Sequence, residues 1–258
     1  MKFNLVPPAK FYGSNRWNAS FFLAESAGYR VCEGFRMVVL GELCSERREF
    51  LFPGNFPERK FNYVGLENIS QATRMLVGFA PKVGAEVKSR SKIFHKGDIL
   101  YGRLRPSLNK CLLVDGMLSE GICSTELLVL VGNEDVVLSE YLCELMVSTE
   151  VSRQIQCLVA GAALPRVQVK DLLRIEVPIP DRDVQEKVVS QVRSARQELV
   201  QHIRRVRELP VEIGGAFSDF AFRGASFAIN PTAGDGQTDW VNPLPDSARG
   251  GQQQLRLR

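Results

Sequence analysis

The stretch from Lys96 to Val131, KGDILYGRLRPSLNKCLLVDGMLSEGICSTELLVLV, decides the fold class. It contains three runs rich in apolar and β-branched residues, separated by residues that are typical of turns. The runs are Asp98–Leu104, Lys110–Val114 and Glu126–Val131, and each predicts a β-strand. This stretch therefore supplies the β part of the expected fold.

Shorter runs on both sides of this stretch predict further elements. Val38–Leu40 and Tyr63–Leu66 predict short strands, and Leu172–Ile179 predicts one last strand before the prolines. A helix is expected over Ser139–Leu158, capped by its first residue, with apolar residues repeating along one side. Strands and helices in this order predict an α+β fold, with one mixed domain over residues 1–180.

A single long helix is predicted over residues 181–210. Pro180 prevents an earlier start, because the residue before a proline disfavours helical geometry. Asp183 and Glu186 have the spacing of a capping box, with Asp in the Ser/Thr role. The sequence then contains no proline or glycine until Pro210, where we expect the helix to end.

The apolar positions of this helix form a narrow stripe with heptad spacing. A stripe of this width suits packing against one other helix, although folding back onto the first domain is the alternative. A histidine occupies one position of the stripe, where its partly polar side chain could set the register of two helices. The expected interface consists of Val188, Val192, Ala195, Leu199, His202, Val206 and Leu209.

The C-terminal region, residues 211–258, has a different composition. Glycine, glutamine, proline and serine dominate it, especially after Pro231. This composition predicts a flexible, disordered tail.

The overall composition excludes several classes of protein. Hydrophobic residues make up 45% of the 258 residues and the formal net charge is only +4, as in an ordinary soluble protein. The sequence has neither an apolar run long enough to span a bilayer nor the pattern of a signal peptide, so we expect a cytoplasmic protein without membrane contact. The six cysteines form no CxxC pair and predict small, buried, reduced side chains.

Motifs for catalysis, metal binding and cofactor binding are also missing from the sequence. There is no glycine-rich phosphate loop, no GxSxG and no HExxH, and His95 and His202 are the only histidines. Glu86-Val87-Lys88 has the Glu-x-Lys spacing of some nucleases, but a convincing acidic partner is missing upstream. We therefore expect no catalytic residue, no metal site and no cofactor.

Positive charge is concentrated between Lys82 and Lys110. This window holds eight Lys and Arg residues against Glu86 and Asp98, a local balance of +6, which exceeds the charge of the whole chain. Clustered cations suit a phosphate backbone, because each neutralised phosphate releases counterions. In extended segments, residues two apart share a face, so Lys88, Arg90 and Lys92 should point together, as should Arg103 and Arg105. A solvated basic face without a ligand is the alternative. The expected DNA contacts are Lys88, Arg90, Lys92, Lys96, Arg103, Arg105, Asn109 and Lys110.

Three segments together resemble the target-recognition domain of type I restriction–modification specificity subunits. The first segment is Tyr63–Ile69, YVGLENI. The second is Lys96–Pro106, KGDILYGRLRP, which continues through Asn109-Lys110 to Gly121–Glu126. The third is Gly161–Arg166, followed by Asp171-Leu172, Val177–Pro180 and Gln185 at the opening of the long helix.

The resemblance implies a DNA sequence-specificity subunit without chemistry of its own. Such a domain reads one half of a split target in double-stranded DNA, and the subunit docks a DNA adenine methyltransferase subunit and often a restriction endonuclease subunit. Family members usually carry two recognition domains and two helices, whereas this chain has room for one of each. It is therefore expected to be a half-subunit that pairs with a second copy or with a different specificity chain. A non-catalytic interaction or regulatory protein of another phage-defence complex is the alternative.

Overall fold

The computed structural model describes residues 34–116, 118–159 and 164–223. Contacts divide the chain into two compact units, Met1–Glu186 and Lys187–Arg258, so the division falls within the first turns of the long helix. Three of the predictions above lie outside the described residues, wholly or in part: the beginning of the first domain, the Gly161–Ala163 part of the third segment, and the tail beyond residue 223.

The first sheet contains the three strands predicted from Lys96 to Val131. These are β8 (Ile99–Gly102), β9 (Cys111–Leu113) and β11 (Leu127–Gly132), and β2 (Cys44–Glu46) completes the order β2-β11-β8-β9. All neighbouring strands are antiparallel. Every residue of β8 and β9 is buried, which explains why these runs are continuously apolar rather than alternating.

A second four-stranded sheet has the order β3-β7-β10-β5. Its strands are β3 (Phe50–Leu51), β7 (Ser91–His95), β10 (Glu120–Cys123) and β5 (Tyr63–Val64), and only β10 and β5 run parallel. Gly121 in β10 is required by packing, because a Cβ there would lie 2.6 Å from the Phe94 ring and closer still to the Asn62 carbonyl oxygen. Beside this sheet, β4 (Lys60–Phe61) pairs with β6 (Lys82–Val83).

Short 3₁₀ turns link these strands. They are η1 (Pro53–Asn55), η2 (Leu66–Asn68), η3 (Gly84–Glu86) and η4 (Pro106–Leu108). Asn68 in η2 is buried, accepts a hydrogen bond from the Gly65 N–H at 2.9 Å and donates to the Gly78 carbonyl at 3.0 Å. This pairing explains why a polar asparagine can lie inside the YVGLENI segment.

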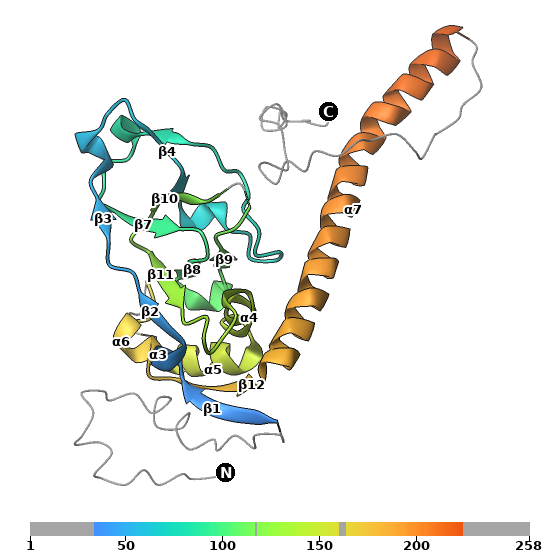
Figure 1. Cartoon of the computed structure of the whole chain (residues 1–258). Helices are drawn as coiled ribbons and strands as arrows, with labels where there is room; N and C mark the ends of the chain where they lie inside the picture. The colour runs from blue at the N-terminus through green and yellow to red at the C-terminus, as the bar shows by residue number, and fades with distance from the viewer. Residues whose placement is uncertain (1–33, 117, 160–163, 224–258) are drawn as a thin grey trace, which may run out of the picture. The chain divides into compact units, whose positions relative to one another are not determined.

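A two-stranded sheet joins the two ends of the described domain. β1 (Phe35–Val39) pairs antiparallel with β12 (Glu176–Pro180), with Phe35 opposite Pro180 and Val39 opposite Glu176. The short helix α3 (Leu40–Leu43) follows β1 directly, and its Leu40 N–H donates to the Ile175 carbonyl at 2.9 Å. Figure 1 shows β1 and β12 at the end of the domain opposite β4.

The structure corrects two predicted elements of the first domain. The helix predicted over Ser139–Leu158 is two helices, α4 (Ser139–Leu145) and α5 (Thr149–Leu158). Ser139 is the first residue of α4 rather than its cap, and Ser148 caps α5 by accepting a hydrogen bond from the Val151 N–H at 3.3 Å. The predicted strand Leu172–Ile179 begins later, because its first residue ends helix α6 (Val169–Leu172).

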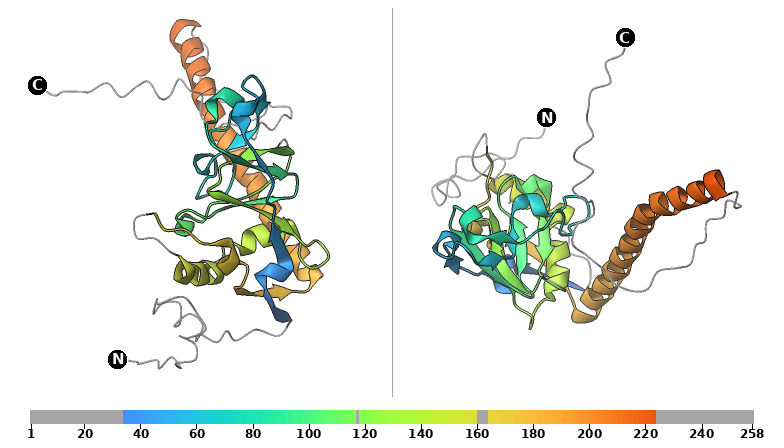
Figure 2. Two further views of the ribbon diagram at one scale, coloured as in Figure 1. Left: turned by 90° about the vertical axis from the view of Figure 1, so that its left-hand side faces the viewer. Right: turned by 90° about the horizontal axis from the view of Figure 1, so that it is seen from above.

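The long helix α7 runs from Arg182 to Arg223, so the predicted end at Pro210 is wrong. Its 42 residues correspond to about 63 Å at 1.5 Å per residue. A proline inside a helix removes one backbone hydrogen bond and favours a bend, but it need not end the helix when its neighbours on both sides keep helical geometry. Consistent with this, the right-hand view of Figure 2 shows α7 bending along its length.

The start of α7 also differs from the predicted capping box. The carbonyl of Asp181 accepts hydrogen bonds from the N–H groups of Val184 and Gln185, while Asp183 lies in the first turn of the helix. A carboxylate in the first turn still interacts favourably with the helix dipole. None of the helices in the described part of the chain is long and apolar enough to cross a bilayer.

Four of the five described cysteines are buried as predicted, whereas Cys157 is half-buried. Cys44, Cys111, Cys123 and Cys143 are free and buried, and the sulfur atoms of Cys111 and Cys143 lie 3.5 Å apart. Burial raises the pKa of Cys44 and of Cys123 to about 12. These thiols therefore stay protonated and act as small apolar side chains.

Candidate nucleic-acid interface

The predicted basic window does not form one continuous face. Lys88 and Arg90 precede β7 and are exposed, as is Lys96 in the turn between β7 and β8. The Arg90 guanidinium lies 4.1 Å from the centre of the Phe50 ring, a cation–π contact that orients it beside β3. These three cations are free to meet a phosphate backbone.

Contrary to the sequence-based prediction, Lys92 does not share an exposed face with Lys88 and Arg90. Its side chain is 5% exposed, and its Nζ donates to Glu46 Oε1 at 2.8 Å. Ser91, the preceding residue of β7, is fully buried as well. Ser91 and Lys92 are consecutive residues at the start of β7 and point to opposite faces of the sheet, so both faces are covered at this end of the strand. The charge of Lys92 is neutralised inside the fold, and this residue is not available to DNA.

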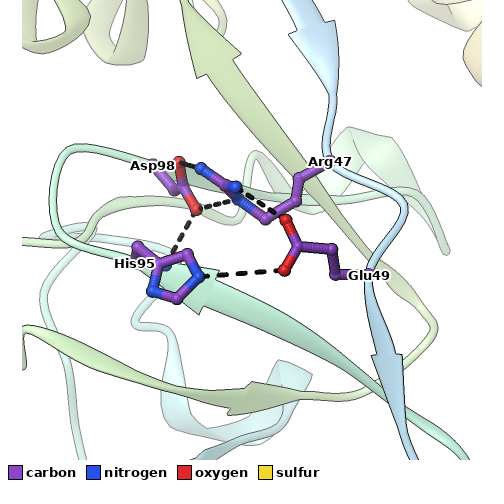
Figure 3. Close-up of polar contacts among 4 residues, drawn as sticks. All are labelled: Arg47, Glu49, His95 and Asp98. Carbon is purple, nitrogen blue, oxygen red and sulfur yellow. Dashed lines mark hydrogen bonds and ion pairs between the residues drawn. The ribbon is translucent and has the colours of Figure 1, made fainter.

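The turn that carries Lys96 is held by a network of ion pairs (Figure 3). The Arg47 guanidinium donates to both carboxylate oxygens of Asp98, at 2.8 and 3.1 Å, and to Glu49 Oε1 at 2.9 Å. Asp98 also accepts from the His95 backbone N–H at 2.8 Å, and the hydrogen bonds of Asp98 and Glu49 raise the pKa of Arg47. Because Asp98 is almost fully buried, this network fixes the turn in one geometry.

His95 takes part in this network through its ring as well. Its Nε2 lies 4.0 Å from Glu49 Oε2, and the imidazole is about half exposed. Glu49 already binds Arg47, so the carboxylate that faces the imidazole belongs to an ion-pair cluster rather than to an acid–base pair.

The second half of the window lies against other elements. Arg103 Nη2 donates to Gln168 Oε1 at 3.1 Å, Lys110 Nζ donates to the Leu66 carbonyl at 2.6 Å, and Asn109 Oδ1 accepts from Ser152 Oγ at 3.1 Å. Of the four predicted contacts here, Arg105 is exposed, and Arg103, Asn109 and Lys110 are half-buried. β8 ends at Gly102 and Arg105 has a left-handed backbone with φ of 47°, so the extended geometry expected to align Arg103 with Arg105 is not present.

An ion pair that sequence reasoning missed borders this second group. The Arg166 guanidinium donates to both oxygens of Glu126, with the shortest distance 2.7 Å from Nη2 to Oε1. The hydrogen bonds from Arg166 lower the pKa of Glu126. The Arg103 backbone N–H donates to the Glu126 carbonyl at 2.9 Å, and the Nε of Arg103 is buried without a hydrogen-bond partner among the described residues. No local pattern could have revealed this pair, since the two residues are 40 positions apart.

Gln185 connects the start of α7 to the first domain. Its side chain is 1% exposed, its Oε1 accepts from the Leu138 N–H at 3.0 Å, and its Nε2 donates to the carbonyls of Val136 and Pro180 at 3.3 and 3.0 Å. Arg182 adds a hydrogen bond to the Glu134 carbonyl at 2.9 Å. The first turn of α7 is therefore fixed to the loop before α4.

The seven residues of the predicted stripe lie on the described part of α7. None of them is buried: Ala195, His202 and Val206 are exposed, and the other four are half-buried. Val206 has 66% of its surface exposed. The partner expected from the heptad spacing is not part of the structure, so helix pairing stays a prediction.

In sequence and in fold, the chain is similar to specificity subunits of type I restriction–modification systems. The HindI type I restriction enzyme specificity subunit of Haemophilus influenzae is 30% identical over 100 residues, which cover 38% of this chain and 22% of that protein. No family model matches the chain.

Two solved structures extend the similarity over most of the chain. The HsdS subunit from Thermoanaerobacter tengcongensis is 27% identical with a TM-score of 0.57, over 80% of this chain and 54% of that one. A chain from a study of complex assembly and conformational transition of the type I R-M system is 27% identical with a TM-score of 0.58, over 81% and 53%. The chain thus spans about half the length of these structures and about a fifth of the curated relative. The resemblance predicted from the three sequence segments is confirmed.

Proposed function

We propose that this chain is a DNA sequence-specificity subunit of a restriction–modification system and performs no chemistry itself. The observation that carries the proposal is the similarity, over four fifths of the chain, to two solved type I chains. The exposed cations Lys88, Arg90, Lys96 and Arg105 supply the phosphate contacts, since Lys92 is neutralised in the core. Acting on DNA places the chain in the cytoplasm, with a DNA adenine methyltransferase and a restriction subunit as partners.

The DNA-binding part of the proposal is tested by selection from random duplexes. The chain is purified together with its methyltransferase, and bound duplexes are sequenced. We expect enrichment of one motif split by a spacer, with log affinity falling against log salt at a slope of roughly −4 for four phosphate contacts. Charge reversal at Lys96 and Arg105 should weaken binding by more than about tenfold. A complex that prefers no duplex over any other would overturn the proposal.

The chain pairs through α7 in this proposal. The heptad spacing of the stripe and the absence of any buried residue among its seven positions support the helix as the contact, either with a second copy or with a different specificity chain. A twofold pair of identical chains would read a palindromic split site.

Substitutions in the stripe test this pairing. Val192→Asp together with Leu199→Asp places two charges in the seam and should convert a dimer into a monomer in analytical ultracentrifugation. Gln191→Asp together with Gln197→Asp, at exposed positions of the same helix, is the matched control and should leave the dimer intact. A wild-type chain that sediments as a monomer, alone and with its methyltransferase, would contradict the pairing.

A further inference from the structure

Exposed phenylalanines cluster on one short segment of the domain. Three of the seven exposed large hydrophobic residues in the described part of the chain fall between positions 50 and 56. Phe50, Phe52 and Phe56 have 39%, 55% and 44% of their surface exposed. Single exposed apolar residues are ordinary, but three on one turn form a patch of the kind that marks a binding site.

The turn that presents these side chains is well defined. Its 3₁₀ turn η1 packs against η3, and any Cβ on Gly84 would collide with the carbonyl oxygens of Pro53 and Phe56. The Gly84 N–H donates to the Arg59 carbonyl at 2.9 Å, which ties the two turns together. The phenylalanines are therefore held outward by close backbone packing, which lowers the entropy that binding must overcome.

Five cations lie in the same segments as the exposed aromatic side chains. We name residues 50–61 and 82–90 the aromatic–basic tip, and it holds five cations against the carboxylates of Glu58 and Glu86. Figure 1 shows that β4, within the tip, lies at the end of the domain opposite β1 and β12. Several cations stack on rings: Arg90 on Phe50 at 4.1 Å, Lys82 on Tyr63 at 4.5 Å and Arg59 on Phe61 at 4.9 Å. The remaining two cations, Lys60 and Lys88, are exposed.

We propose that Phe52 and Phe56 contact the bases of duplex DNA while the cations of the aromatic–basic tip hold the flanking phosphates. This inference rests on the proposed function and assigns the part of the domain that reads sequence. Duplex DNA offers apolar surface, such as thymine methyl groups and base steps, directly beside rows of phosphate charge. The tip combines the same two features, because its exposed phenylalanines lie in segments with five cations and two carboxylates. An uncharged protein partner would leave this net charge of +3 without a counterpart.

The experiment separates base contacts from phosphate contacts by their salt dependence. Affinity for the selected duplex is measured at several salt concentrations, with the chain in complex with its methyltransferase. Phe52→Ala with Phe56→Ala should weaken binding by about tenfold or more and leave the salt slope unchanged, because an apolar contact releases no counterions. The same variant should lose part of the preference for the selected duplex over a scrambled one.

Two further variants complete the comparison. Lys88→Gln with Arg90→Gln should make the salt slope shallower by about 2 and weaken all duplexes alike. Phe35→Ala, an exposed phenylalanine in β1 outside the tip, should change neither affinity nor slope. Thermal melts establish that each variant is folded.

Several outcomes would overturn the inference. One is unchanged DNA affinity in the Phe52→Ala, Phe56→Ala variant, and another is an equal loss of DNA affinity in the Phe35→Ala control. A third is weaker binding of the methyltransferase by the Phe52→Ala, Phe56→Ala variant, which would make the tip a protein-docking surface. Each differs from failure of the proposed function, in which the wild-type complex itself shows no preferred duplex.

Discussion

Replacing Gln185 tests whether the long helix is fixed to the recognition domain by one buried side chain. Gln185→Ala removes an acceptor from the Leu138 N–H and a donor from the carbonyls of Val136 and Pro180. Alanine cannot reach any of the three backbone groups. They would be left unpaired in a site where the glutamine itself is only 1% exposed.

The magnitude follows from the number of bonds and their burial. A net contribution of about 1 kcal/mol per hydrogen bond, with a further penalty for each group left buried and unpaired, gives a loss of about 2–4 kcal/mol. Water entering the space left by the side chain would reduce the loss toward the lower figure. Gln185→Glu keeps the acceptor for Leu138 but turns a carboxylate toward two carbonyl oxygens, so it should destabilise the protein at neutral pH and recover as the pH falls and the carboxyl gains a proton.

Urea denaturation at pH 7 and amide hydrogen exchange of Leu138 measure the effect. Gln191→Ala removes a glutamine from an exposed position of the same helix and is the control, with an expected change within about 0.5 kcal/mol. Gln185→Ala should also accelerate hydrogen exchange at the Leu138 amide, because Gln185 Oε1 accepts the hydrogen bond of that amide in the native fold. A loss below about 1 kcal/mol, or unchanged exchange at Leu138, would refute the anchoring role.

Two more predictions concern charges that the fold has paired. Glu126→Gln should lower stability by about 0.5–1 kcal/mol at pH 7, since Arg166 lowers the pKa of Glu126 and the pair therefore stabilises the fold above the ordinary glutamate pKa. In melts at a series of pH values, this difference should fade as the pH falls below about 4.5, the ordinary value, and a constant difference would contradict the assignment. Lys92→Met should cost about 2–3 kcal/mol by leaving Glu46 with only its exposed partner Arg48, yet duplex affinity of the folded variant should stay unchanged. Affinity reduced as strongly as in a Lys88→Gln variant would restore Lys92 to the DNA contacts.

Local patterns in the sequence predicted three of the four strands of the first sheet, β8, β9 and β11, and the family resemblance. β8, β9 and β11 were found because each is a continuous apolar run with turn residues on both sides. The Asn68 and Gln185 positions stood out within the recognised segments, and the structure shows a physical reason for each in buried hydrogen bonds. These features depend on neighbours in the chain or on one strong local motif.

Features that depend on distant residues could not be predicted. The burial of Lys92 follows from Glu46, 46 positions earlier, and counting charges in a window cannot detect such a partner. The phenylalanines of the aromatic–basic tip were overlooked because apolar residues are expected inside, although Pro53 and Gly54 between them signal a turn. The helix through Pro210 shows the limit of a local rule, because a proline weakens one turn without setting the end of a long helix.

The length of α7 and the exposure of its apolar stripe both favour packing against a second helix. Helices in water gain most of their stability from packing of an apolar face, yet no residue of the Val188–Leu209 stripe is buried. An internal proline adds a cost of about 3 kcal/mol, which a solitary helix would have to offset by local propensity and by i,i+4 pairs such as Arg204–Glu208. A second helix along the stripe would supply the missing burial. Association and helix content should therefore be lost together in the Val192→Asp, Leu199→Asp variant when followed by sedimentation and far-UV circular dichroism. A monomeric variant that keeps the full helical signal would show that α7 holds its structure without a partner.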